Sequence, residues 1–147
     1  MNWKQEAIEK LKDYSSRAAS MDNLKEQIAN TRADITSMRH SRADAVAVRG
    51  SSTSRRDDRL INAICSVEEM KNNLQLTGRW LKTMDNALSK LTQEEYHVLD
   101  VFFIHPQKGA VNRLRDEFCL QEESSIYRRR EQALRRFTLH MYGMMES

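Results

Sequence analysis

The residues best suited to recognition chemistry lie near the end of the chain, in the segment IYRRREQALRRF at residues 126–137. At about 100° per residue, a helix over this segment has an apolar side with Ile126, Ala133 and Phe137. The opposite side carries hydroxyl, amide and guanidinium donors: Ser124, Ser125, Arg128, Arg129, Gln132, Arg135 and Arg136. Such donors bind phosphate oxygens and base edges in the major groove. The pattern therefore suits a helix that packs on a core through one face and could bind nucleic acid through the other.

The same arginines also suit an ordinary solvated helix surface, and for an isolated helix that interpretation is favoured. The preceding elements shift the balance toward recognition, because together they predict a three-helix unit of the helix-turn-helix kind. Arg130 falls on the packing side of the last helix. It is expected to extend past the edge of the core or to pair with Asp116 or Glu117.

Local signals place the helices of this unit. Thr92 and Glu95 have the spacing of a capping box, which starts a helix that His105-Pro106 ends. A short helix is predicted over about 110–118, followed by a turn at residues 119–122. The last helix is predicted from about Glu123 to Met141, with Gly143 as its C-cap.

Two long amphipathic helices are predicted before this unit, over residues 3–38 and from about Asp57 to Leu91. Each has one narrow apolar stripe, and a polar linker near residues 39–56 separates them. The pattern favours an antiparallel helical hairpin like a coiled coil, although a continuous parallel dimer through residues 1–38 fits the same stripe. The predicted domains are the hairpin at residues 1–91 and the helix-turn-helix domain at residues 92–147.

Composition supports an all-α protein with long solvated helices, since 31 % of the residues are charged and only 4 are glycine and 1 proline. Residues 92–147 carry eight Lys and Arg against nine Asp and Glu, so any affinity for nucleic acid depends on how charge is arranged. With no secretory leader and no apolar run of about 20 residues, we expect a cytoplasmic protein without membrane contact. Cys65 and Cys119 are expected to be reduced and to fill core positions.

Catalysis finds little support in the sequence. There is no Gly-rich phosphate loop, no nucleophile elbow and no Cys/His cluster with metal-ligand spacing. Neighbouring acids such as Glu94 and Glu95 point about 100° apart on a helix and do not form a carboxylate dyad. We expect no enzymatic activity and no cofactor. The four histidines are expected at surface or edge positions: His40, His97, His105 and His140.

From Leu91 onward the chain resembles region 4 of bacterial sigma factors. The resemblance rests on the opening Leu-Thr-x-x-Glu, an aromatic-rich helix, a helix-turn-helix, and the close Ala-Leu-Arg-Arg-Phe at residues 133–137. With the upstream hairpin and its Val-Arg-Gly-Ser linker, residues 46–140 are similar to phage-encoded regulators of the ArpU and RinA type, which are thought to activate late or packaging genes.

The resemblance implies a transcriptional regulator with double-stranded DNA as partner. It implies that Ser124, Ser125, Arg128, Arg129 and Gln132 face the major groove, and that Lys108, Arg113, Arg115, Arg135 and Arg136 touch the backbone. The hairpin is expected to contact host RNA polymerase or to form a homo-oligomer. Two alternatives stay open: a small terminase-like packaging protein, and a coiled-coil interaction protein without DNA binding.

Overall fold

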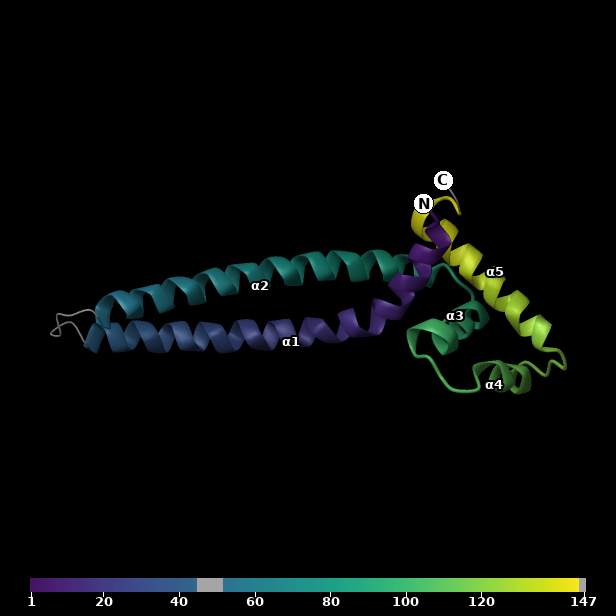
Figure 1. Cartoon of the computed structure of the whole chain (residues 1–147), viewed down its shortest axis with the longest axis horizontal. Helices are drawn as coiled ribbons and strands as arrows, with labels where there is room; N and C mark the ends of the chain where they lie inside the picture. Colours follow the sequence, from purple (N-terminus) through teal and green to yellow (C-terminus); the bar gives the residue numbers. More distant parts are fainter. Residues whose placement is uncertain (45–51, 146–147) are drawn as a thin grey trace. The chain divides into compact units, whose positions relative to one another are not determined.

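The computed structural model describes residues 1–44 and 52–145 of the 147-residue chain. Within those ranges the chain is helical and contains no strand, which confirms the expected all-α class. Two long helices come first, α1 (Trp3–Asp44) and α2 (Ser52–Ser89). They are followed by α3 (Gln93–Leu99), a π-helical turn η1 (Asp100–Ile104), α4 (Ala110–Glu117) and α5 (Glu123–Tyr142) (Figure 1). No described helix is both long and apolar enough to cross a membrane.

The chain forms two compact units. Unit 1 joins Met1–Ala18 to Trp80–Ser147, and unit 2 is Ala19–Arg79, so α1 and α2 each pass from one unit into the other. The division therefore does not fall between residues 91 and 92, where the sequence placed a domain boundary. Apolar residues near the start of α1 and the end of α2 share a core with α3 and α5, which explains the difference.

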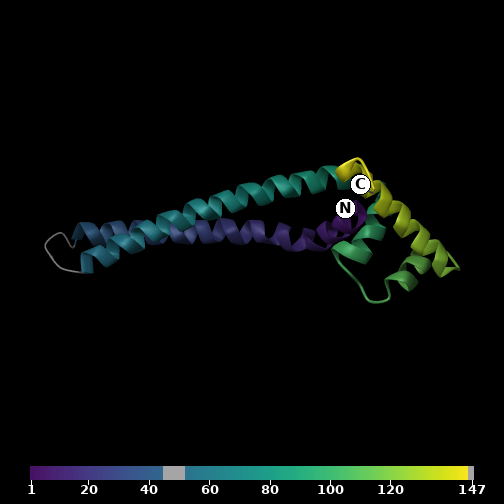
Figure 2. The same ribbon diagram turned by 45° about the horizontal axis from the view of Figure 1, so that its top comes forward.

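In unit 2 the two long helices lie side by side and run in opposite directions (Figure 1 and Figure 2). Their seam contains Ile28 and Ile35 from α1 and Val67 from α2. Nearer unit 1, Gly78 faces the side chain of Met21, whose Cε lies 3.5 Å from the position that a Cβ at residue 78 would take. The part of the predicted stripe that contains these residues is therefore covered by the other long helix of the same chain.

A two-helix seam is narrow, and residues just beside it stay in solvent. Ile64, which the predicted stripe included, is 36 % exposed, and Ile61 is 57 % exposed. Cys65 is also exposed, as is Cys119 in unit 1. The expectation that both cysteines fill core positions is wrong, because each lies next to an apolar position and not on it.

Residues 45–51 of the predicted linker near residues 39–56 lie outside the described residues, and the parts of the linker on either side of them are helical. α1 continues to Asp44 and α2 already begins at Ser52, ahead of the predicted start at Asp57. Arginine, alanine and serine do not end a helix strongly, whereas glycine does. Gly50, the strongest break signal in this stretch, lies outside the described residues.

Unit 1 is built around α3 and α5. One buried cluster joins Leu11 of α1 and Met84 of α2 to Leu99, Leu134 and Phe137. A second cluster packs α4 into the same unit and contains Val98, Val101, Leu114 and Ile126. Val98 and Leu99 are neighbours in the sequence but enter different clusters, so α3 contributes to both clusters that contain residues of α5.

The local signals for helix ends are confirmed. Thr92 and Glu95 form both hydrogen bonds of the capping box at the start of α3. The helical stretch that follows ends at Ile104, immediately before His105-Pro106. Gly143 caps α5 with a φ of 73°, a left-handed conformation that glycine adopts without a steric penalty.

Candidate nucleic-acid interface

The turn between α4 and α5 sets where α5 begins. The Leu120 N–H donates to the carbonyl of Arg115 at 2.9 Å, and Cys119 adopts a φ of 55°. This is the left-handed geometry that commonly ends a helix, reached here without the usual glycine. Glu122 precedes α5 and makes no side-chain cap, although the Ser124 hydroxyl donates to its carboxylate at 3.2 Å.

The apolar side of α5 is buried as predicted. Ile126, Ala133 and Phe137 are fully buried, and Leu134 is 1 % exposed. Thr138 is also buried, with its hydroxyl donating to the Leu134 carbonyl at 2.7 Å. Since the buried side fixes the rotation of the helix, the opposite side faces solvent. Its exposed residues include Ser124, Arg128, Gln132 and Arg135.

Two arginines of α5 reach back to acids on α3. Arg129 Nη1 lies 3.3 Å from Glu94 Oε2, and the Arg129 guanidinium stands 4.8 Å from the centre of the Phe118 ring. Arg136 is paired with Glu95, which also accepts the Thr92 N–H. Arg128 and Arg135 make no ion pair within the described part of the chain. On α5, therefore, Arg129 and Arg136 are paired with acids of α3, whereas the guanidinium groups of Arg128 and Arg135 can meet a ligand without breaking a described ion pair.

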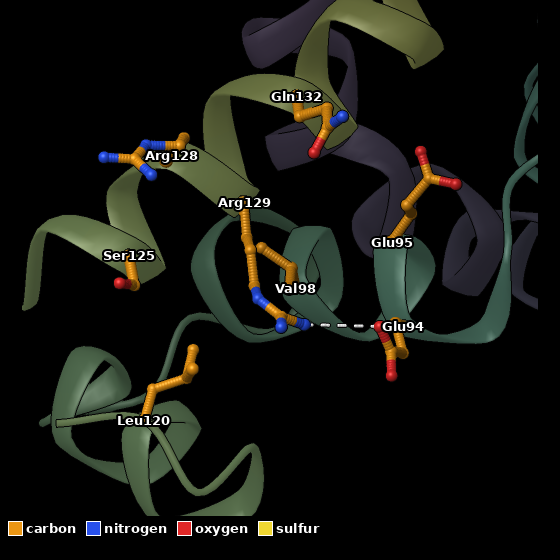
Figure 3. Close-up of a pocket in the computed structure, with 8 residues that line it drawn as sticks. All are labelled: Glu94, Glu95, Val98, Leu120, Ser125, Arg128, Arg129 and Gln132. Atoms are coloured by element: carbon orange, nitrogen blue, oxygen red, sulfur yellow. Dashed lines mark hydrogen bonds and ion pairs between the residues drawn. The ribbon is translucent and has the colours of Figure 1, made fainter. Parts of the chain in front are cut away.

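A cleft of about 470 Å³ is lined by residues of α3, of α5 and of the turn that precedes α5. Figure 3 shows Arg129 extending across it toward Glu94, while Arg128 points away from α3. Carboxylates form one wall, hydrogen-bond donors form the other, and two apolar side chains complete the lining. The lining residues are Glu94, Glu95, Val98, Leu120, Ser125, Arg128, Arg129 and Gln132. Six of the ten predicted contact residues line this cleft or lie on the outer face of α5, namely Ser124, Ser125, Arg128, Arg129, Gln132 and Arg135.

The residues predicted to touch a nucleic-acid backbone are in varied environments. Arg113 pairs with Glu117 at 3.0 Å and also donates to Gln107. Arg115 is half-buried beside Glu123 at 3.6 Å. Lys108 is exposed in the turn before α4. Arg135 is exposed on α5, whereas Arg136 is held by α3.

Of the two alternatives expected for Arg130, the ion pair with Asp116 or Glu117 is not observed among the described residues. Its guanidinium lies 5.0 Å from the centre of the Phe102 ring and 4.9 Å from that of Tyr127, so it stacks between two aromatic rings. Cation–π contacts of this kind satisfy an arginine at the edge of a core. Phe102 lies in the π-helical turn η1, and no local sequence signal indicated that turn.

His97 and Glu117 connect α3 to α4, with 2.5 Å between Nε2 and Oε2. The pKa of the Glu117 carboxyl is lowered from its ordinary value of 4.5, first by the hydrogen bond with His97 and then by that from Arg113. The expected edge position of His97 is confirmed, but its partner lies twenty residues away and gave no signal in the sequence.

The start of α1 contacts the other end of α5. Lys4 pairs with Glu131, and the rings of Trp3 and Tyr142 are 4.7 Å apart. Lys10 also lies over the Tyr142 ring at 4.9 Å. The sequence interpretation placed these residues in a separate hairpin at residues 1–91 and missed this contact. The only signal for it was the apolar stripe that begins near Ala7.

No protein family model, curated protein or solved structure matches the chain. Within residues 1–44 and 52–145, no three His, Cys, Asp or Glu side chains are grouped so that they could hold a metal ion. The main feature of the site is α5, which is buried on one side and carries guanidinium, hydroxyl and amide donors on the other.

Proposed function

We propose that α3, η1, α4 and α5 form a helix-turn-helix module that binds double-stranded DNA, with α5 as the recognition helix. One observation carries this proposal: α5 buries its apolar side completely and exposes Ser124, Arg128, Gln132 and Arg135 on the other. Arginine bonds guanine edges and phosphates, and glutamine bonds adenine edges. The short α4 before the turn is the usual neighbour of such a helix.

The charge pattern supports selective contact and not general adhesion to DNA. Many basic side chains of unit 1 are already paired with acids, including Arg113, Arg115, Arg129 and Arg136. Arg128 and Arg135 are left as the exposed cations of α5 without a described ion pair. Glu123, near the start of the helix, is partly neutralised by Arg115, which reduces its repulsion of phosphate.

The resemblance to sigma region 4 gives this activity a biological setting. The protein acts in this proposal as a phage or prophage regulator that activates late or packaging genes. Its C-terminal module binds DNA near a promoter. The long helix pair contacts RNA polymerase or associates with a second copy.

The test is selection of bound duplexes from a random-sequence pool, followed by fluorescence anisotropy on an enriched duplex at several salt concentrations. The variant Arg128→Ala with Arg135→Ala should lose specific binding. The matched control, Arg32→Ala with Arg39→Ala, removes the same charge from exposed positions of α1 in unit 2 and should bind like the wild type. Absence of any salt-dependent binding by the wild type would refute the proposal.

A second candidate function is assembly through the long helices. The observation that favours it is the small seam of unit 2, whose described buried residues are Ile28, Ile35 and Val67, while Ile61 and Leu76 are more than half exposed. A second copy would cover such residues as a coiled coil does. Light scattering distinguishes the cases: a ring would favour a terminase-like packaging protein, and oligomers that bind no DNA would favour a pure interaction protein.

A further inference from the structure

The two acids at the start of α3 hold two arginines of α5, but they hold them differently. Glu94 faces Arg129, and Glu95 faces Arg136. The side chain of Glu94 is 69 % exposed, whereas that of Glu95 is 16 % exposed. Adjacent residues of the same type thus have different surroundings, which the sequence alone does not distinguish.

Glu95 is part of the local structure of the helix. Its carboxylate accepts the Thr92 N–H at 3.2 Å, and its own N–H donates to the Thr92 hydroxyl at 3.2 Å. The same carboxylate oxygen is paired with Arg136. Removal of Arg136 from this position would leave a largely buried carboxylate with fewer partners, which is costly. Arg136 is therefore a structural residue.

Glu94 has no such role within the described chain, where its one ion pair is the 3.3 Å contact with Arg129. Exposed pairs of this kind stabilise a fold only slightly. The Arg129 guanidinium is also stacked on Phe118, so it keeps its place at the cleft when the carboxylate moves away. Arg129 can consequently exchange Glu94 for another anion without loss of its position.

A carboxylate and a DNA phosphate offer the same chemistry to a guanidinium, namely anionic oxygens that accept its N–H groups. We propose that Glu94 is an internal competitor of DNA phosphate for Arg129 and thereby lowers the DNA affinity of α5. This inference rests on the proposed DNA binding. In this proposal DNA phosphate displaces Glu94 from Arg129. Arg136 stays paired with Glu95, stabilises the fold and does not contact DNA.

The experiment compares Glu94→Gln with Glu95→Gln, because the two variants change the same charge at adjacent positions. Binding of the full chain to an enriched duplex is measured by anisotropy, and stability by thermal melting. Glu94→Gln should tighten binding about two- to five-fold, the range expected for release of an exposed ion pair, with an unchanged melting temperature. Glu95→Gln should lower the melting temperature without tightening binding.

Two controls separate the inference from a general effect of charge. Glu69→Gln, at an exposed position of α2 in unit 2, removes the same charge elsewhere and should leave affinity unchanged. In a chain that carries Arg129→Ala, measured at low salt so that Arg128 and Arg135 sustain binding, Glu94→Gln should have no effect.

The outcomes distinguish this inference from the proposed function. If the wild type binds DNA and all three glutamine variants tighten binding equally, the effect is one of net charge and the competitor role is overturned. The role is also overturned if Glu94→Gln still tightens binding without Arg129. If neither the wild type nor any variant binds DNA, the proposed function itself fails, and the inference fails with it.

Discussion

Replacement of Arg128 by alanine should separate DNA binding from folding. Arg128 is exposed, points away from α3 and makes no ion pair within the described residues (Figure 3). Truncation of such a surface side chain changes stability by no more than about 0.5 kcal/mol. A base-edge arginine contributes ~1–3 kcal/mol of discrimination, which corresponds to a loss of about 5- to 140-fold in affinity for the preferred duplex.

Arg136→Ala is the matched comparison on the same helix. Its loss leaves the Glu95 carboxylate, whose side chain is only 16 % exposed, without the guanidinium. Loss of a charged hydrogen-bond partner from a largely buried group costs ~1–3 kcal/mol. In a unit of this size each kcal/mol lowers the melting temperature by about 4–8 °C. The expected result is therefore a less stable protein from Arg136→Ala and a weaker binder from Arg128→Ala.

The assay pairs circular dichroism melting with anisotropy on the preferred duplex and on an unrelated duplex. If Arg128 bonds a base edge, its loss weakens binding to the preferred duplex alone. If it bonds phosphate, both duplexes are weakened and the salt slope falls by about one unit. Unchanged binding to both duplexes would refute its placement at the interface, and a large drop in melting temperature would refute the claim that it is free of the core.

Three further predictions concern the fold. Leu134→Asp places an unpaired charge in the core of unit 1 and should abolish its cooperative melting; a melting curve like that of the wild type would contradict the core assignment. Gly78→Ala should stabilise the protein by about 0.4–1 kcal/mol, because alanine reduces the conformational entropy of the unfolded chain and its methyl group fits at 3.5 Å from Met21; a lower denaturation midpoint in urea would contradict this. Glu117 has a lowered pKa, so its contribution to stability is present above the ordinary value of 4.5 and is lost as the pH falls through the lower folded value. Glu117→Gln should therefore reduce the loss of melting temperature in acid, and an identical acid profile would argue against the pair with His97.

The features that sequence predicted well depend on neighbours along the chain. The capping box needs only Thr92 and Glu95, and the C-cap of α5 needs only Gly143 after an apolar-periodic segment. The apolar side of α5 follows from helical periodicity alone, so its buried residues were predictable.

The features that sequence missed depend on contacts between distant segments. An arginine on α5 is available to a ligand only if no acid of the protein is paired with it. Arg129 and Arg136 are paired with Glu94 and Glu95, which lie 35 and 41 residues earlier in the sequence. Arg130 likewise found aromatic rings and not an acid, because η1 brings Phe102 to the edge of the core. Periodicity gives the direction of a side chain, but it does not give the charge of the surface that the side chain meets.

Residues 1–18 belong to the same compact unit as the C-terminal helices because they share a buried core with them. Phe137 and Leu134 share a buried cluster with Leu11 of α1 and Met84 of α2, so α3 and α5 alone would expose a large part of that core to water. The start of α1 also contacts the middle of α5 through Lys4 and Glu131, and the C-terminal end of α5 through Trp3 and Tyr142. α4 packs near its N-terminal half through Leu114 and Ile126. Because both halves of α5 contribute residues to a buried cluster, the rotation of its outer face is fixed by the fold. If the proposed function holds, such a helix loses little conformational freedom on binding, so we expect a small number of exposed donors to be enough to discriminate between duplexes.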